Sequence, residues 1–255
     1  MAGTTQRLLT GLLTNDARLI RRDGFLIMMA AVLAVIAIVL RFLLPWADVY
    51  LAEAGLLPNA YVANSLSAYY PVIVSYMTLF DGALITGAIF GFVLLDEKDG
   101  HTLQALMVTP VRLRSYVGYR VVLPSLLTAI VVPIQILVID QAVVGGVSLI
   151  LFGIGAGLAT PLIVLFYAIA AENKVQGFAM AKFVGLGGLL ILFGFFVPEP
   201  WQWGLALFPP FLVHKAYWLA LEGSAGWPIL WGIGVVWQIV VTLAMIRLFE
   251  RRMRR

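Results

Sequence analysis

The sequence contains no cysteine and few charged residues. Cysteine is absent from all 255 residues, and Asp, Glu, Lys and Arg together make up only 12%. The first absence excludes a disulfide framework, a thiol nucleophile and a thiolate metal site. The charged fraction lies well below the ~25% of soluble domains. Because 62% of the residues are hydrophobic and the mean hydropathy is +0.99, we expect an integral membrane protein.

Motifs for nucleotide binding and for catalysis are also missing. A phosphate-binding Walker loop needs Gly-Lys-Ser or Gly-Lys-Thr, and none of the four lysines stands in that context. A metalloprotease would need His-Glu-x-x-His, whereas His101 and His214 stand alone, outside the expected spans. The acidic cluster of Asp96, Glu97 and Asp99 could hold a divalent cation, but a solvated helix terminus is the favoured interpretation. We therefore expect no enzyme and no cofactor bound by this chain, so that any ATP would be bound by a separate one.

Six apolar stretches are long enough to cross a bilayer, which takes about 20 residues of helix. The sequence therefore predicts an all-α fold in a single transmembrane domain over 1–255. The expected spans are 25–44, 71–95, 121–139, 147–170, 177–197 and 227–249. In the fourth span Gly153, Gly157 and Pro161 recur at four-residue spacing, which predicts a seam for close helix packing.

The segment 198–226 before the last span is apolar but divided. Pro209-Pro210 splits it into two runs that are each too short to cross. We expect two short re-entrant helices on the external side. Their aromatic residues would be anchors at the outer membrane interface: Trp201, Trp203, Tyr217 and Trp218. His214 is also expected at that interface.

Residues 5–22 show the pattern of an amphipathic interfacial helix, with leucines on one side and basic residues on the other. Asp16 falls on the apolar side and is the one misfit. Fifteen of the 17 lysines and arginines fall on one side of the expected membrane, which leaves only Arg41 and Lys215 on the other. The positive-inside rule therefore predicts a multi-pass protein of the cell membrane with both termini in the cytoplasm. Nothing in this distribution indicates a nucleic-acid partner.

Asp81 is the only acidic residue deep inside an expected span. A carboxylate at mid-membrane costs ~2.5–3.5 kcal/mol on insertion scales, so such a residue is a functional candidate. Thr78 lies nearby on the same small, polar stripe of the helix. Two interpretations stay open: a role of Asp81 and Thr78 in the transport path or subunit interface, or a hydrogen-bonded packing residue.

The polar segment 96–120 separates the second and third spans. Its first half predicts a short helix, because Asp99 can cap the first turn and Leu103, Leu106 and Met107 share one face. Thr109-Pro110 then ends that helix, since proline disfavours the helical conformation of the residue before it. A short helix with one apolar face, where a span leaves the membrane, is well placed to lie in a partner's groove.

This segment also carries a family resemblance. Glu97-Lys98, Thr102-Leu103-Gln104-Ala105-Leu106, Val108-Thr109-Pro110 and Tyr116 resemble the cytoplasmic loop of type-2 ATP-binding-cassette (ABC) permeases, and are most similar to fluoroquinolone and other drug exporters. The run Glu172 to Gly177 is similar to the same branch. The sequence departs from the family pattern at Gly100-His101, where charged residues are usual.

The resemblance implies a permease that exports a hydrophobic drug, antibiotic or lipid-like substrate. It implies two partners: an ABC ATPase subunit, which holds the ATP and Mg, and a second permease subunit in a homodimer or paired heterodimer. The segment 96–120 would be the loop that couples to the ATPase, which docks on 96–110. The implied coupling residues are Glu97, Asp99, Thr102, Leu103, Leu106, Met107, Thr109 and Pro110.

Other functions remain open at this point. The first alternative is an ABC permease for glycans or other cargo. The second, from another class, is an intramembrane enzyme or an ATP-independent carrier. A carrier built from inverted repeats would show similar halves with matched broken segments, and the sequence shows no such similarity.

Overall fold

The computed structural model describes residues 11, 14, 16–18, 21–55, 65–100 and 113–253. Six helices within these residues are long and apolar enough to cross a membrane: 24–53, 66–99, 118–139, 146–170, 174–196 and 227–252. The expectation of an all-α membrane protein with six spans is therefore confirmed. Of the predicted interfacial helix, the described residues are helical, and their position at a membrane surface stays a prediction.

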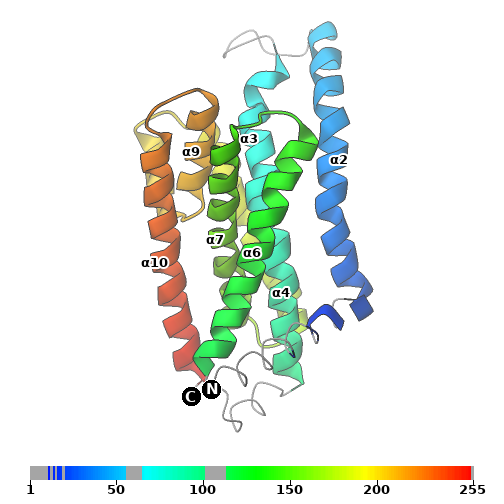
Figure 1. Cartoon of the computed structure of the whole chain (residues 1–255), viewed down its shortest axis with the longest axis vertical. Helices are drawn as coiled ribbons and strands as arrows, with labels where there is room; N and C mark the ends of the chain where they lie inside the picture. Colours follow the sequence, from blue (N-terminus) through cyan, green and yellow to red (C-terminus); the bar gives the residue numbers. More distant parts are fainter. Residues whose placement is uncertain are drawn as a thin grey trace.

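The long helices stand side by side in one bundle (Figure 1). They are α2 (Gly24–Glu53), α6 (Leu113–Ile139), α7 (Gly146–Ala170), α8 (Lys174–Phe196) and α10 (Trp227–Met253), together with the composite second span. At one end of the bundle α2 begins and α4 and α10 end; we call it the basal end, and the opposite one the distal end.

The second span is a succession of short helices rather than one regular helix. It comprises η1 (Leu66–Tyr69), α3 (Tyr70–Ser75), η2 (Tyr76–Phe80) and α4 (Asp81–Asp99). The segment η2 is a π-helix. A single π-turn inside a membrane helix leaves local backbone groups displaced and is frequent at functional sites, and here it ends immediately before Asp81.

The glycine seam of the fourth span is confirmed. A Cβ atom on Gly153 would lie 2.6 Å from the carbonyl oxygen of Ala129, and one on Gly157 would lie 2.5 Å from that of Ser125. Both carbonyls belong to α6. The absence of a side chain therefore lets α6 and α7 approach to backbone contact, as small residues do in membrane bundles.

The segment 198–226 holds two short helices, η3 (Trp201–Leu207) and α9 (Phe211–Leu221). In Figure 1 α9 lies beside α10 and α7 in the distal half of the bundle. Trp201 and Trp203 are 78% and 47% exposed, as interfacial anchors would be.

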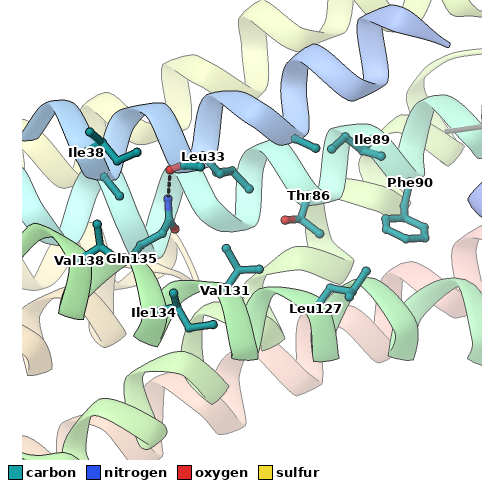
Figure 2. A pocket seen from close by; sticks show the side chains of 13 residues that line it. Leu33, Ile38, Thr86, Ile89, Phe90, Leu127, Val131, Ile134, Gln135 and Val138 are labelled. Atoms are coloured by element: carbon teal, nitrogen blue, oxygen red, sulfur yellow. Dashed lines mark hydrogen bonds between the residues drawn. The ribbon is translucent and has the colours of Figure 1, made fainter. Parts of the chain in front are cut away.

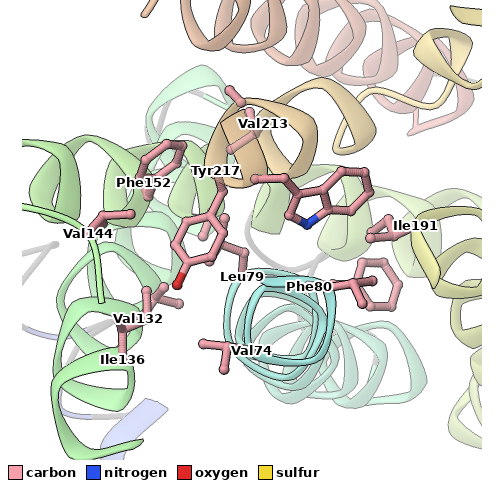
Figure 3. Close-up of a cluster of buried hydrophobic side chains, with 14 of the residues drawn as sticks. Val74, Leu79, Phe80, Val132, Ile136, Val144, Phe152, Ile191, Val213 and Tyr217 are labelled. Carbon is pink, nitrogen blue, oxygen red and sulfur yellow. The ribbon is translucent and has the colours of Figure 1, made fainter. Parts of the chain in front are cut away.

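The placing of Tyr217, Trp218 and His214 at the interface is wrong. Their exposed fractions are 0%, 4% and 2%. The helix α9 is buried along most of its length, so its aromatic residues fill the core of the distal half instead of facing headgroups. Figure 3 shows Tyr217 within this buried hydrophobic cluster. The polar tips find partners inside the bundle: Tyr217 donates to the carbonyl of Ala142, and Trp218 Nε1 donates to Ser75 Oγ at 2.9 Å.

Candidate functional site

The predicted coupling residues lie at the basal end, around the connection between α4 and α6. Glu97 and Asp99 belong to the last turn of α4, whose C-cap is Gly100. The helix α6 then begins at Leu113. The other predicted coupling residues lie outside the described residues: Thr102, Leu103, Leu106, Met107, Thr109 and Pro110.

A buried ionic cluster joins the two ends of this connection. Arg120 of α6 donates from Nη2 to Glu97 of α4, and from Nη1 to Asp16 at 2.8 Å. Tyr116 also donates its hydroxyl to Glu97, and Tyr119 donates to Asp16 Oδ2 at 2.7 Å. Asp16, Glu97 and Arg120 are each less than 10% exposed. We call these five residues the Arg120 cluster.

The Arg120 cluster explains Asp16, the misfit of the N-terminal helix pattern. A carboxylate on an apolar face is costly to bury unless a cation and hydrogen bonds compensate for the lost water. Here the Arg120 guanidinium supplies both. The cluster therefore holds the N-terminal segment against α4 and α6, and it occupies Glu97 within the chain. The sequence analysis singled out Tyr116 by the family resemblance, and Glu97 by that resemblance and as part of an acidic cluster. It did not single out Arg120.

A second, half-exposed group of charges lies nearby at the start of α8. Lys174 Nζ lies 2.8 Å from Asp96 and 3.2 Å from Asp23, and the Lys174 amide donates to Asp99 at 3.4 Å. Burial acts to raise the pKa of Asp23, but the hydrogen bonds from Lys174 and from the first amides of α2 outweigh it and leave the pKa below its usual value. Asp96 and Asp99 are thus ion-paired or hydrogen-bonded to the first residue of α8.

Two further cations, Lys98 and Arg252, donate hydrogen bonds to backbone carbonyls at the basal end of α7. Lys98 donates to the carbonyls of Ala168 and Ala171, at 2.5 and 2.9 Å. Arg252 of α10 donates to Ile169 at 2.6 Å. Carbonyls in the last turn of a helix lack partners within that helix, and cations favour this position. The ends of α4 and α10 are therefore both hydrogen-bonded to the basal end of α7.

Asp81 and Thr78 are not joined to one another. Thr78 is fully buried and donates to the carbonyl of Val74 at 2.7 Å, within its own helical stretch. Asp81 is partly buried at the start of α4, and no hydrogen bond or ion pair is found for it among the described residues. Its role in a transport path or subunit interface stays a prediction. No group of three or more His, Cys, Asp or Glu that could hold a metal ion is found in the described part of the chain.

A groove of about 440 Å³ lies between α2, α4 and α6. Most of its lining is aliphatic or aromatic, and its two polar side chains are Thr86 and Gln135. Figure 2 shows Gln135 reaching across from α6 to the backbone of α2, where its Nε2 donates to Leu33 at 2.8 Å. The sequence analysis did not single out Gln135. The signal was present, because an amide in the middle of an apolar span is itself unusual.

Comparison with known proteins places this architecture in a family. Two relatives from Mycobacterium tuberculosis, in strains CDC 1551 / Oshkosh and ATCC 25618 / H37Rv, are named fluoroquinolones export permease proteins MT2760 and Rv2686c. Each is 32% identical over 192 residues, which cover 73% of this chain and 75% of the relative. The family model described as "Fluoroquinolones export permease protein Rv2686c-like" matches residues 16–246. That match runs from Asp16 of the Arg120 cluster to the last turns of α10, and the chain belongs to this family of export permeases.

Proposed function

We propose that this chain is the membrane-spanning subunit of an ABC exporter in the cell membrane. A separate ATPase subunit docks on the 96–110 loop, and ATP hydrolysis there drives export. The observation that carries the proposal is the Arg120 cluster, in which Arg120 of α6 pairs both with Glu97, at the end of α4 where the loop begins, and with Asp16 of the N-terminal segment. A displacement of the loop is then passed directly to α4 and α6.

The charge distribution supports a cytoplasmic basal end. Lys98, Arg120, Lys174 and Arg252 all lie there and contact carboxylates or helix carbonyls. Basic residues accumulate on the cytoplasmic side of membrane proteins. Both termini are then cytoplasmic, and the short helices η3 and α9 belong to the external half of the bundle.

The subunit composition follows from the number of spans. Six spans are half the complement that the family resemblance implies, so the transporter is a homodimer or a paired heterodimer with two ATPase subunits. ATP and Mg bind to those ATPases, because no lysine of this chain stands in a Walker loop. The cargo is a hydrophobic, drug-like molecule; the printed names of the two relatives, which specify fluoroquinolones, support this class.

The test introduces a negative charge on the proposed apolar docking face. A buried leucine contributes ~1.5–3 kcal/mol, and an aspartate there would also be desolvated without a partner. Leu106→Asp should abolish co-purification of an ABC ATPase, identified by its Walker motif in mass spectrometry, while the permease still inserts. The control is Gln104→Ala, on the opposite face, which should retain the ATPase. If Leu106→Asp retains both the ATPase and drug-stimulated ATP hydrolysis, the loop is not the docking element.

A further inference from the structure

Asp81 is an accessible carboxylate in the middle of the second span. That span covers residues 66–99, so Asp81 stands about halfway along it. The residue is partly exposed, and no hydrogen bond or ion pair is found for its side chain among the described residues. Carboxylates at this depth are costly, and they typically pair with another group or mark a pathway for a substrate or ion. The carboxylate of Asp81 is therefore free to accept a hydrogen bond from a ligand.

The neighbours of Asp81 along the helix show which way it projects. Phe80 packs against α8, and Gly82 packs against α6. Gly87 packs against α7. Because successive residues of a helix project about 100° apart, Asp81 points away from α7, on the side of α4 between α8 and α6.

The second span is half-open on this side. Among residues 78–95 only Asp81, Leu84 and Ile85 are not buried. Met77, one turn before Asp81, is also half-buried. We call these four residues the Asp81 face. Three of them are apolar, so an apolar molecule that lies along this face brings its polar group to the carboxylate.

The backbone immediately before Asp81 is a π-helix whose own polar groups have partners. Thr78 donates to the carbonyl of Val74 at 2.7 Å, and Ser75 Oγ accepts from Trp218 of α9 at 2.9 Å. Turns of this kind are frequent at functional sites. The local structure is thus stabilised by groups other than the carboxylate of Asp81.

Neither a nearby lysine nor a metal ion accounts for Asp81. Lys182 of α8 lies six residues, or about 9 Å of helix, nearer the basal end than Gly188, which packs against Phe80. A metal ion such as Ca²⁺ would need six or more oxygen ligands, roughly. No group of three or more His, Cys, Asp or Glu that could supply them is found in the described part of the chain.

The charge of Asp81 selects the chemistry of its ligand. An anion would be repelled, and a lipid acyl chain would leave the carboxylate unpaired. We propose that Asp81 recognises a cationic cargo: an apolar molecule with a protonated amine lies along the Asp81 face, and its ammonium group donates to the carboxylate. Hydrogen bonds between two charged groups are roughly twice as strong as neutral ones. Asp81 is then a specificity-determining residue that favours amphiphilic cations over neutral and anionic molecules.

The inference deepens the proposed export function and rests on it for the identification of the ligand as cargo. The two relatives are named for fluoroquinolones, and many molecules of that class carry a basic amine. Binding needs neither ATP nor the ATPase, so it is measured on the permease alone. A failure of the Leu106→Asp experiment would leave the binding result unaffected, and the reverse also holds.

The first experiment measures binding of norfloxacin, a fluorescent fluoroquinolone with a protonated secondary amine, to the purified permease in lipid nanodiscs. Asp81→Asn removes the charge at almost constant size. Loss of a hydrogen bond between charged groups corresponds to roughly ten- to hundredfold in affinity, so norfloxacin should bind this variant more weakly by that factor. Asp81→Glu keeps the carboxylate and should retain most of the affinity. Unchanged affinity in Asp81→Asn, or no binding to the wild type, would overturn the proposal.

A second ligand separates recognition of the cation from a merely structural effect. N-acetylated norfloxacin has no protonated amine, so it should bind the wild type about as weakly as norfloxacin binds Asp81→Asn. The substitution should not weaken its binding further. An equal loss of both ligands in Asp81→Asn would mean that the carboxylate only supports the packing of α4, and the proposal would be wrong.

The matched control is Asp140→Asn. Asp140 pairs with Arg41 near the distal end, and its side chain is 65% exposed. The same change of charge there should leave the affinity for norfloxacin unchanged. A comparable loss in Asp140→Asn would mean that norfloxacin responds to the net charge of the protein, which would contradict recognition by Asp81.

A second copy of the chain is the rival source of a cation, through its Lys182. The mass of the purified permease, measured by light scattering, distinguishes the two. Asp81→Asn should have the same mass as the wild type. A variant of half that mass that binds norfloxacin with wild-type affinity would show that Asp81 pairs between subunits, and the proposal would fail.

The location is tested by cysteine protection, which the absence of native cysteine makes clean. Leu84→Cys places a thiol on the Asp81 face. Norfloxacin should slow its reaction with an apolar maleimide but should not slow the reaction of Ile150→Cys, at an exposed position of α7. Equal rates at Leu84→Cys with and without norfloxacin would place the bound molecule elsewhere and would overturn the proposal.

Discussion

Arg120 has only 2% of its surface exposed. Two carboxylates compensate for the burial of its positive charge. Both are themselves buried, with side-chain exposures of 4% for Asp16 and 8% for Glu97. Moving such charges out of water costs several kcal/mol for each ion. The Coulomb attraction offsets this desolvation cost only when the geometry is good and further hydrogen bonds form. Tyr116 and Tyr119 supply those hydrogen bonds. The cluster therefore behaves as a unit, and removing its centre is more damaging than removing an ordinary ion pair.

Substitution of the central arginine tests this at the residue scale. Arg120→Leu leaves two carboxylates buried without a cation and should destabilise the protein by roughly 3–5 kcal/mol. The measurement is the thermal midpoint of the purified permease, followed by tryptophan fluorescence. Arg41→Leu is the control, because its ion pair with Asp140 spans 3.6 Å with side chains 45% and 65% exposed; such pairs contribute about 0–1 kcal/mol. Similar losses in the two variants would contradict a special role for the cluster.

The pairing of α6 with α7 sets the packing at the scale of elements. Between two membrane helices there is no hydrophobic gain over lipid, so association depends on close van der Waals contact. Gly153 meets the ring of Pro133, and Gly157 meets the backbone of Ser125. Thr160 extends the seam by donating to Thr128 Oγ1 at 2.9 Å. A methyl group added at Gly153 or Gly157 would therefore collide with α6.

Gly157→Ala tests that contact. The new Cβ would lie 2.5 Å from the Ser125 oxygen, which is backbone and cannot turn away, so α6 and α7 must separate and the thermal midpoint should fall by several degrees. Gly185→Ala in α8 is the matched control, since a Cβ there meets nothing within 4 Å. Alanine is the better helix former by about 1 kcal/mol, so this variant should be as stable as the wild type or more so. A harmless Gly157→Ala would mean that the seam is not tightly packed.

Some elements could be predicted from the sequence and others could not, for physical reasons. The seam was predictable, because the four-residue spacing of Gly153, Gly157 and Pro161 places them on one helix face whatever the partner is. The burial of Tyr217 and Trp218 was not, since apolar and aromatic character suits a lipid interface and a protein core equally. The π-helix Tyr76–Phe80 was not predictable either. It depends on how the backbone adapts to its neighbours, not on a residue pattern.

At the scale of the whole molecule, the number of spans followed from length and hydropathy, but the positions of the helices did not. Asp16 and Arg120 are 104 residues apart in the sequence, and no periodicity links them. Gln135 and Leu33 lie in different spans, and their hydrogen bond appears only once α2 and α6 are placed. The Arg120 cluster and the groove are thus both products of tertiary packing. The coupling residues from Thr102 to Pro110 remain predictions.

The orientation of the bundle decides whether an ATPase can reach the 96–110 loop. Glu172, in the connection between α7 and α8, is exposed at the basal end, and Ala225 is exposed just before α10. Ala225 is preferable to its neighbour Gly223, whose φ of +74° disfavours any side chain. The chain has no native cysteine, so a single introduced thiol reports one position.

With a membrane-impermeant maleimide, Ala225→Cys should react in intact cells, and Glu172→Cys should react only after permeabilisation. The reason is that one full span, α8, separates the two residues, while η3 and α9 enter and leave on the same side. If the segment 201–221 crossed the membrane as a further span, both cysteines would lie on one side and would react together. If Glu172→Cys alone reacted in intact cells, the basal end would face outward, and the coupling loop would be beyond the reach of ATP.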